Sequence, residues 1–225
     1  MSNVAPPLIP QSFSFRAAFR CPKIEGMPRS GKGRLLDLPD SSLLPMLGLL
    51  DGRTPWAEVR VAWNSEGLGV ALDVSGKSGN LTHVADRPEE SDGVQLWIDT
   101  RDTRDIHRAS RYCHRFHLAV VPGKGKGLEV AVRQLAIPRA TGEAPLADLG
   151  PVRSLAQRSR SGYRLEAFLP ASVLHGFDPE TNRRLGFCYR VTDPDRGDQF
   201  LTVGREFPVG EDPSLWATLE LSEGS

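Results

Sequence analysis

One short segment of the chain combines an aromatic ring with polar side chains at alternating positions. Gln95, Trp97 and Asp99 occupy every second position, and aliphatic residues fill the positions between them. An extended chain would place these three on one side and a core face on the other. An aromatic ring flanked by hydrogen-bonding groups suits a ligand that is half apolar and half polar, such as a sugar ring. The segment therefore predicts a strand with a core face and a binding face.

Polar residues of matching parity occur on further predicted strands. Arg115 and His117 share one strand, Arg190 lies on another and Arg164 on a third. If these strands are neighbours, one sheet face carries an aromatic ring, guanidinium groups, an imidazole and an amide. Sugar hydroxyls take planar, bidentate partners such as Arg, Asp and Gln. The alternative is cross-strand ion pairing on a solvated sheet, with Trp97 covered by a loop.

The elements that must position these residues are short strands. The 225 residues include 22 Gly and 18 Pro, which fits many strands joined by turns. Residues 59–74 read as a hairpin, and 170–176 as one short helix with Pro at its start and Gly at its end. We expect an all-β fold, an antiparallel β-sandwich of jelly-roll type with one or two short helices.

The domain boundaries follow from the same patterns. Residues 35–222 are predicted to form a single β-sandwich domain, without a linker or an internal repeat. Residues 1–34 are predicted to be an N-terminal extension, in which the alternating segment 12–16 is a candidate first strand.

The charge balance and the motifs exclude several function classes. Lys and Arg number 28, as do Asp and Glu, so nothing calls for nucleic acid or a membrane surface as partner. The chain has no Gly-x-Ser-x-Gly elbow, glycine-rich phosphate loop or His-Glu-x-x-His motif, and no catalytic residue is predicted. The start of the chain does not resemble a signal peptide, so the protein is expected to be cytoplasmic, or secreted if the start is mis-assigned.

Metal and cofactor sites receive little support from the sequence. The three cysteines have no paired spacing, so neither a disulfide framework nor a zinc site is predicted. Asp193, Asp195 and Asp198 alternate in a way that suits a calcium loop, although a plain Asp-Pro turn explains them as well. No cofactor is expected, with calcium as the alternative.

A series of short motifs follows one order along the chain. They are Asp51-Gly52 before Trp56, Val61-Ala62-Trp63-Asn64, Asp92-Gly93-Val94-Gln95-Leu96-Trp97-Ile98-Asp99, Tyr163-Arg164-Leu165-Glu166, Leu185-Gly186-Phe187 and Pro213-Ser214-Leu215-Trp216. In this order they resemble the family 9 carbohydrate-binding modules and the wider superfamily that shares their β-sandwich, over residues 50–221. The resemblance implies an antiparallel sandwich, a sugar held between two Trp side chains with polar groups and an Arg around it, and calcium sites.

The resemblance carries over to this chain in part. Trp97 lies in the matching strand and would supply one aromatic wall. Gln95 stands where many relatives have an acidic residue. The second wall would come from Phe200, with Trp216 as the alternative; Trp63 shares parity with core residues and is predicted to be buried.

Together these observations predict a non-catalytic module that binds a saccharide on an exposed aromatic ring. The predicted ligand-binding residues are Trp97, Gln95, Asp99, Arg115, His117, Arg190 and Phe200. The alternative is an intracellular structural or protein-interaction domain with the same sandwich and no sugar site. An exposed Trp97 in a groove would favour the first hypothesis, and a Trp97 buried beneath a loop would favour the second.

Overall fold

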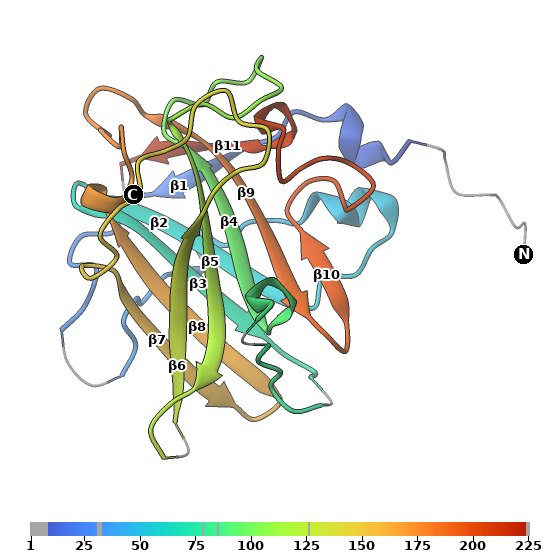
Figure 1. Ribbon diagram of the computed structural model, residues 1–225, viewed down its shortest axis with the longest axis vertical. Helices are drawn as coiled ribbons and strands as arrows, with labels where there is room; N and C mark the ends of the chain where they lie inside the picture. Colours follow the sequence, from blue (N-terminus) through green and yellow to red (C-terminus); the bar gives the residue numbers. More distant parts are fainter. Residues whose placement is uncertain (1–8, 31–32, 78, 85, 126, 224–225) are drawn as a thin grey trace, which may run out of the picture.

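The computed structural model describes residues 9–223 except 31–32, 78, 85 and 126 (Figure 1). The strands are β1 (Ala18–Pro22), β2 (Ala57–Asn64), β3 (Gly67–Val74), β4 (Gly93–Asp99), β5 (Cys113–Pro122), β6 (Leu128–Leu135), β7 (Arg153–Ser159), β8 (Gly162–Pro170), β9 (Arg184–Asp193), β10 (Gly197–Phe200) and β11 (Ala217–Ser222). The helices are 3-10 turns: η1 (Gln11–Ser14), η2 (Asp40–Ser42), η3 (Leu47–Asp51), η4 (Pro88–Glu90), η5 (Ala171–Val173) and η6 (Pro213–Leu215). Within the described residues, none of these helices is long and apolar enough to cross a membrane.

The strands form a sandwich of two layers that are joined at both edges. Their order is β1-β11-β9-β4-β5-β6-β7-β8-β3-β2, with β10 paired to β9. The step from β6 to β7, at the single pair Leu128–Ala156, carries the path from one layer to the other. At the other end a bridge between Lys23 and Trp63 connects the segment after β1 to β2. The predicted all-β sandwich is confirmed.

The core lies between the layers and is filled by the side chains that alternation along the strands points inward. The aliphatic residues of β4 point inward, and Trp63, Tyr163, Tyr189 and Phe116 are fully buried. Each side chain of this kind contributes about 1.5–3 kcal/mol when it leaves water. The predicted burial of Trp63 is confirmed, and the β2–β3 hairpin forms as expected, with Asn64 Oδ1 accepting the backbone N–H of Gly67 at its turn.

The N-terminal segment differs from the prediction. The candidate strand at 12–16 is wrong, because residues 11–14 form η1. The Asp51 carboxylate accepts the backbone N–H of Gln11 at 2.6 Å, and side-chain acceptors of this kind compete with strand pairing. The first strand is β1, which pairs in parallel with β11.

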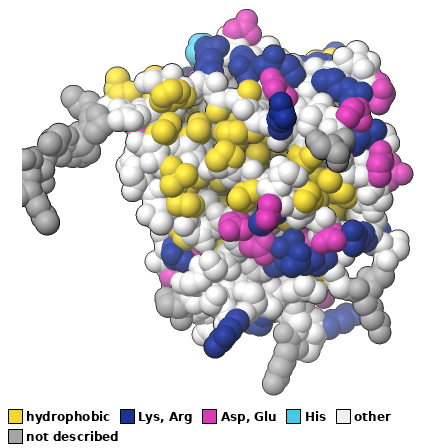
Figure 2. All heavy atoms as spheres, turned by 180° about the vertical axis from the view of Figure 1, so that it is seen from behind, with side chains coloured by type: hydrophobic (Ala, Val, Ile, Leu, Met, Phe, Trp, Pro, Cys, Tyr) yellow, Lys and Arg dark blue, Asp and Glu magenta, His cyan; other side chains and the backbone are white. Residues whose placement is uncertain are grey.

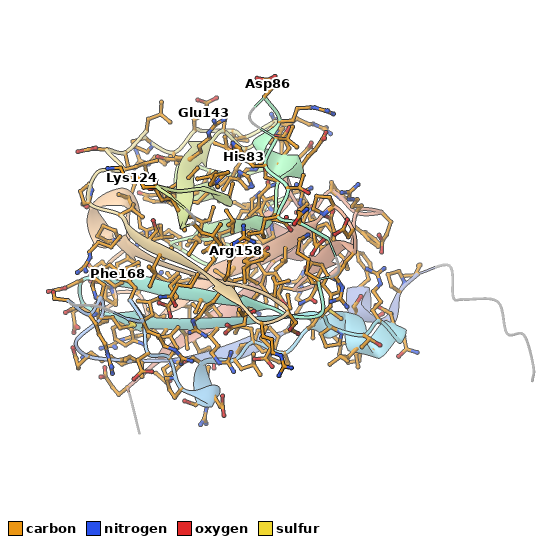
Figure 3. The ribbon with its side chains drawn as sticks, turned by 90° about the horizontal axis from the view of Figure 1, so that it is seen from below. His83, Asp86, Lys124, Glu143, Arg158 and Phe168 are labelled. Carbon is orange, nitrogen blue, oxygen red and sulfur yellow. The ribbon has the colours of Figure 1, made fainter. Side chains whose placement is uncertain are left out.

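The outer face of the β2–β3–β8 layer is covered by the segment that precedes η2. Met27, Leu36 and Phe168 form a second apolar cluster there (Phe168 is labelled in Figure 3). The Glu166 carboxylate accepts the backbone N–H of Leu35 at 2.6 Å and that of Leu36 at 3.2 Å, which holds this cover in place. Figure 2 shows this side of the molecule, with hydrophobic side chains beside a band of charged ones.

The topology also decides which polar strand residues can meet. Arg164 lies on β8, which pairs with β3 and β7. Its guanidinium bonds Glu166 and Asp73 within that layer. The expectation that Arg164 joins the face that carries Trp97 is therefore wrong, because β8 belongs to the opposite layer.

The start of β4 depends on a residue without a side chain. A Cβ on Gly93 would overlap the backbone carbonyl oxygen of Leu118 on β5. Substituting Gly93→Ala should force the β4 and β5 backbones apart and lower the free energy of unfolding by roughly 2–4 kcal/mol, measured by urea denaturation. Gly142→Ala is the matched control, because a Cβ there meets its nearest neighbour at 3.5 Å. Equal stability of the two variants would contradict this account.

Candidate functional site

The register of the front layer brings four of the predicted residues into one row. Phe200 on β10 pairs with Arg190 on β9, Arg190 pairs with Gln95 on β4, and Gln95 pairs with His117 on β5. Directly paired residues of an antiparallel sheet point to the same face. The row therefore crosses four strands on the outer face of this layer.

A second row beside it contains Trp97 and Arg115. Trp97 pairs with Arg115 on one side and with Cys188 on the other. The Arg115 guanidinium lies 5.7 Å from the centroid of the Trp97 ring, a cation–π distance. Its Nε and Nη2 donate to Gln95 Oε1 at 3.1 and 2.7 Å, so Arg115 links the two rows.

Asp99 points to the same face but serves a turn. Its carboxylate oxygens accept the backbone N–H groups of Arg101 at 2.9 Å and of Thr103 at 2.7 Å. This Asx-type arrangement ends β4 and uses both oxygens. Asp99 does not line the pocket described below.

The face that carries these rows is covered. Only 2% of Trp97 is exposed, and Gly210 lies so close that a Cβ there would come within 3.4 Å of the indole. The segment between β10 and η6 crosses the end of the sheet at which Trp97 lies. The turn η4 and the loop that contains Asp86 lie over the strands beside it (Figures 1 and 3). The expectation of an exposed Trp97 on a solvated face is wrong, because loops that the strand pattern cannot place cover β4.

A pocket remains between these loops and the sheet. Its volume is about 510 Å³, within the range of roughly 300–1,000 Å³ that small-molecule sites occupy. Trp97, Arg115, Arg190 and Phe200 come from the strands. The loops contribute Glu89, Glu90, Pro138, Arg205, Phe207, Pro208, Val209, Gly210 and Glu211. Four of the seven predicted residues thus line one cavity, and Gln95 and His117 lie buried in the row beside it.

The electrostatics of this face follow from its burial. Burial lowers the pKa of Arg115, and the charge of Arg190 lowers it further. Burial and the charge of Arg190 together lower the pKa of His117 to about 4, so this imidazole is neutral at pH 7. The face therefore carries two guanidinium charges in an environment that is poorly solvated.

Besides Trp97, the aromatic rings of the pocket come from one strand residue, Phe200, and one loop residue, Phe207. Trp216 is 7% exposed, and its Nε1 donates to the carbonyl of Val209 at 2.7 Å, which anchors the covering loop but leaves the ring outside the pocket. Phe200 lines the pocket together with Phe207, whose ring stacks on Phe13 at 4.7 Å. Phe207 and Arg205 have no strand pattern, so sequence analysis had no signal for them apart from their nearness to Phe200.

The residues proposed for a calcium loop already have cationic partners. The Lys77 ammonium lies 3.0 Å from both Asp92 and Asp193 and 3.4 Å from Asp195. Asp198 points elsewhere and bonds Arg205 and Thr192. The three loop carboxylates do not converge on one point, so they do not fit a calcium ion. Burial alone would lower the pKa of Lys77, but its hydrogen bonds to Asp193 and Asp92 raise it.

Comparisons with known proteins identify the fold. No known family matches the sequence, and no curated protein matches it. A solved family 9 carbohydrate-binding module from Caldicellulosiruptor kristjanssonii, in complex with cellotriose, has a TM-score of 0.60 at 14% identity and covers 92% of this chain and 95% of its own. A second, from the same organism in complex with glucose, has a TM-score of 0.52 at 16% identity and covers 77% and 81%. At these identities the likeness shows the fold alone, and it confirms the resemblance at that level.

The Lys77 cluster should stabilise the protein through charge neutralisation. Lys77→Met leaves Asp92 and Asp193 buried without a cation, and we expect a loss of about 3–5 kcal/mol in the free energy of unfolding at pH 7. Lys124→Met, in the exposed β5–β6 turn, is the control (Figure 3). Chelation with EDTA should leave the wild-type melting temperature unchanged. A stable Lys77→Met protein, or a clear drop in Tm with EDTA, would refute this role.

His117 should make the protein less stable in acid. Between pH 6.5 and about 4 the unfolded chain binds a proton at His117 that the folded protein does not, so stability falls as the pH falls. The expected contribution is about 2 kcal/mol between pH 7 and pH 5. His117→Gln should lose this part of the slope, while His83→Gln, at an exposed loop position, should keep it. If the free energy of unfolding, measured by urea denaturation, fell equally between pH 7 and pH 5 in both variants, the assignment to His117 would be wrong.

Proposed function

We propose that this protein is a non-catalytic module that binds a saccharide in the pocket formed by β4, β5, β9 and β10. The observation that carries the proposal is the register that sets Phe200, Arg190, Trp97 and Arg115 around one cavity. Aromatic and apolar walls suit the CH face of a sugar ring, and guanidinium groups suit its oxygens. The shared fold with two modules that were solved with cellotriose and glucose supports the same ligand class.

The lining of the pocket supports a binding role without catalysis. Among the described residues that line it, none is Ser, Thr, Cys, Tyr, Lys or His. Of its carboxylates, Glu90 pairs with Arg87 at 2.7 Å and Glu211 with Arg139 at 3.7 Å. An enzyme that cleaves glycosidic bonds needs two carboxylates that face each other across the bond. Where such a carboxylate pair would be needed, the strands of this pocket instead place guanidinium groups and aromatic rings.

The second candidate is a structural or protein-interaction domain with the same sandwich and no sugar site. The burial of Trp97 favours it, because only 2% of this residue is exposed and Gly210 lies against the indole. The two candidates differ in one respect that can be measured: a saccharide must change the surroundings of Trp97, and a protein partner at another surface need not.

The indole N–H resonances provide the test. Trp97 Nε1 has no acceptor among the described residues, whereas Trp63 Nε1 donates to Ser222 O at 3.2 Å on the far side of the sandwich. In ¹H–¹⁵N spectra titrated with glucose, cellotriose and other oligosaccharides, we expect a saturable shift of the Trp97 indole signal and an unmoved Trp63 signal. Trp97→Phe assigns the signal and should weaken binding about ten-fold, or about 1.4 kcal/mol. A Trp97 signal that no saccharide moves would overturn the proposal and leave the second candidate.

A further inference from the structure

Two guanidinium groups at the base of the pocket lack a close carboxylate. Arg115 uses the neutral amide oxygen of Gln95 and the backbone carbonyl of Ala136 as acceptors. The nearest carboxylate to Arg190 is that of Asp198, 4.0 Å from its Nε. Asp198 is bonded more closely by Arg205, so the charges of Arg115 and Arg190 are not matched by acidic groups at short range.

The same place has more hydrogen-bond donors than acceptors. Gln95 Nε2, Trp97 Nε1 and Arg190 Nε are buried, and none of the three has a hydrogen-bond acceptor among the described residues, although the Asp198 carboxylate lies 4.0 Å from Arg190 Nε. All three are donors; Gln95 on β4 pairs with Arg190 on β9, and Trp97 lies two residues further along β4. A buried donor without an acceptor costs about 1–3 kcal/mol. A ligand group that only accepts hydrogen bonds would satisfy this surface best, and an ionised carboxylate is such a group.

The acidic side chains of the pocket occupy its rim. Glu89 and Glu90 are exposed, and Glu90 pairs with Arg87. Glu211 pairs with Arg139 across 3.7 Å. The rim therefore carries charges of both signs, since the exposed Arg205 also lines it, and two of its glutamates are ion-paired. Arg115 and Arg190 lie deeper, on the strands, where screening by water is weaker and an acidic substituent would be attracted most strongly.

The walls argue for a ring in addition to an anion. Phe200, Phe207 and Pro208 line the cavity beside the guanidinium groups. A small inorganic anion would leave these apolar surfaces unused, whereas the CH face of a sugar ring covers them. Guanidinium groups receive a planar carboxylate through paired N–H bonds.

We infer that the saccharide of this pocket is acidic and carries a carboxylate, as a uronic acid does, which Arg115 and Arg190 receive. The inference rests on the proposed function and adds the chemical class of the ligand. The carboxylate takes the deep position between β5 and β9, and the sugar ring lies against Phe200 and Phe207. Gln95 contributes indirectly, because its amide oxygen holds the Arg115 guanidinium in position.

The experiment compares cellotriose with the same trisaccharide oxidised to carboxylates at C6, by calorimetry at pH 7 and 150 mM salt. The wild-type protein should bind the oxidised form at least ten-fold more tightly. Arg190→Gln should bring the ratio of the two affinities close to one, and Arg115→Gln provides a second variant if the first does not fold. Arg133→Gln removes the same charge from an exposed position of β6 outside the pocket and should keep the wild-type ratio.

Each outcome separates this inference from the proposed function. Equal or tighter binding of neutral cellotriose would overturn the acidic preference and leave saccharide binding intact. A preference for the oxidised form that survives in both Arg115→Gln and Arg190→Gln would show non-specific charge attraction and would also overturn the inference. If neither sugar binds and the Trp97 indole signal does not move, the proposed function itself fails.

Discussion

The structure depends on the pairing of β4 with β5 on one side and β9 on the other. β4 is the strand through which the polar rows of the front layer run, and it is buried on both faces. The close approach of β4 to β5 at Gly93 fixes the register at its start, and Asp99 ends it by accepting two turn N–H groups. A shift of this register by one residue would exchange Trp97 with its aliphatic neighbours and place the indole in the core. The polar face and the core face are therefore set by one pairing.

Burial of the polar face gives the pocket its chemical character. Polar side chains that leave water need partners, and Arg115 finds one in Gln95. Other donors of the same face have none, and the two guanidinium charges repel each other in a poorly solvated space. Natural proteins keep such costs mostly at sites with a function. This is the physical basis for assigning a ligand to the surface rather than treating it as a solvated sheet.

The Lys77 cluster shows how a lysine side chain neutralises carboxylates that are buried in the fold. Its ammonium lies between carboxylates that come from the start of β4 and the end of β9. The cluster therefore connects the two strands that carry Trp97 and Arg190, at the end of the sheet opposite Asp99. A lysine in this place neutralises two buried carboxylates without the six to eight oxygen ligands that calcium takes. It thereby stabilises this end of β4 and β9.

The sequence by itself determined the all-β class, the parity of β4 and the burial of Trp63, and it singled out Trp97, Arg115 and Arg190 among the residues that line the pocket. These follow from side-chain alternation, which is local and survives in any sheet that buries the aliphatic face. The tertiary structure decided what alternation cannot encode. Strand order placed Arg164 in the opposite layer and Arg190 beside Gln95, and the loop before η6 covered Trp97 and brought Phe207 to the pocket. The pairing of Lys77 with Asp92 and Asp193 likewise joins residues far apart in the chain, because non-local contacts depend on the whole fold and leave no periodic signal in the sequence.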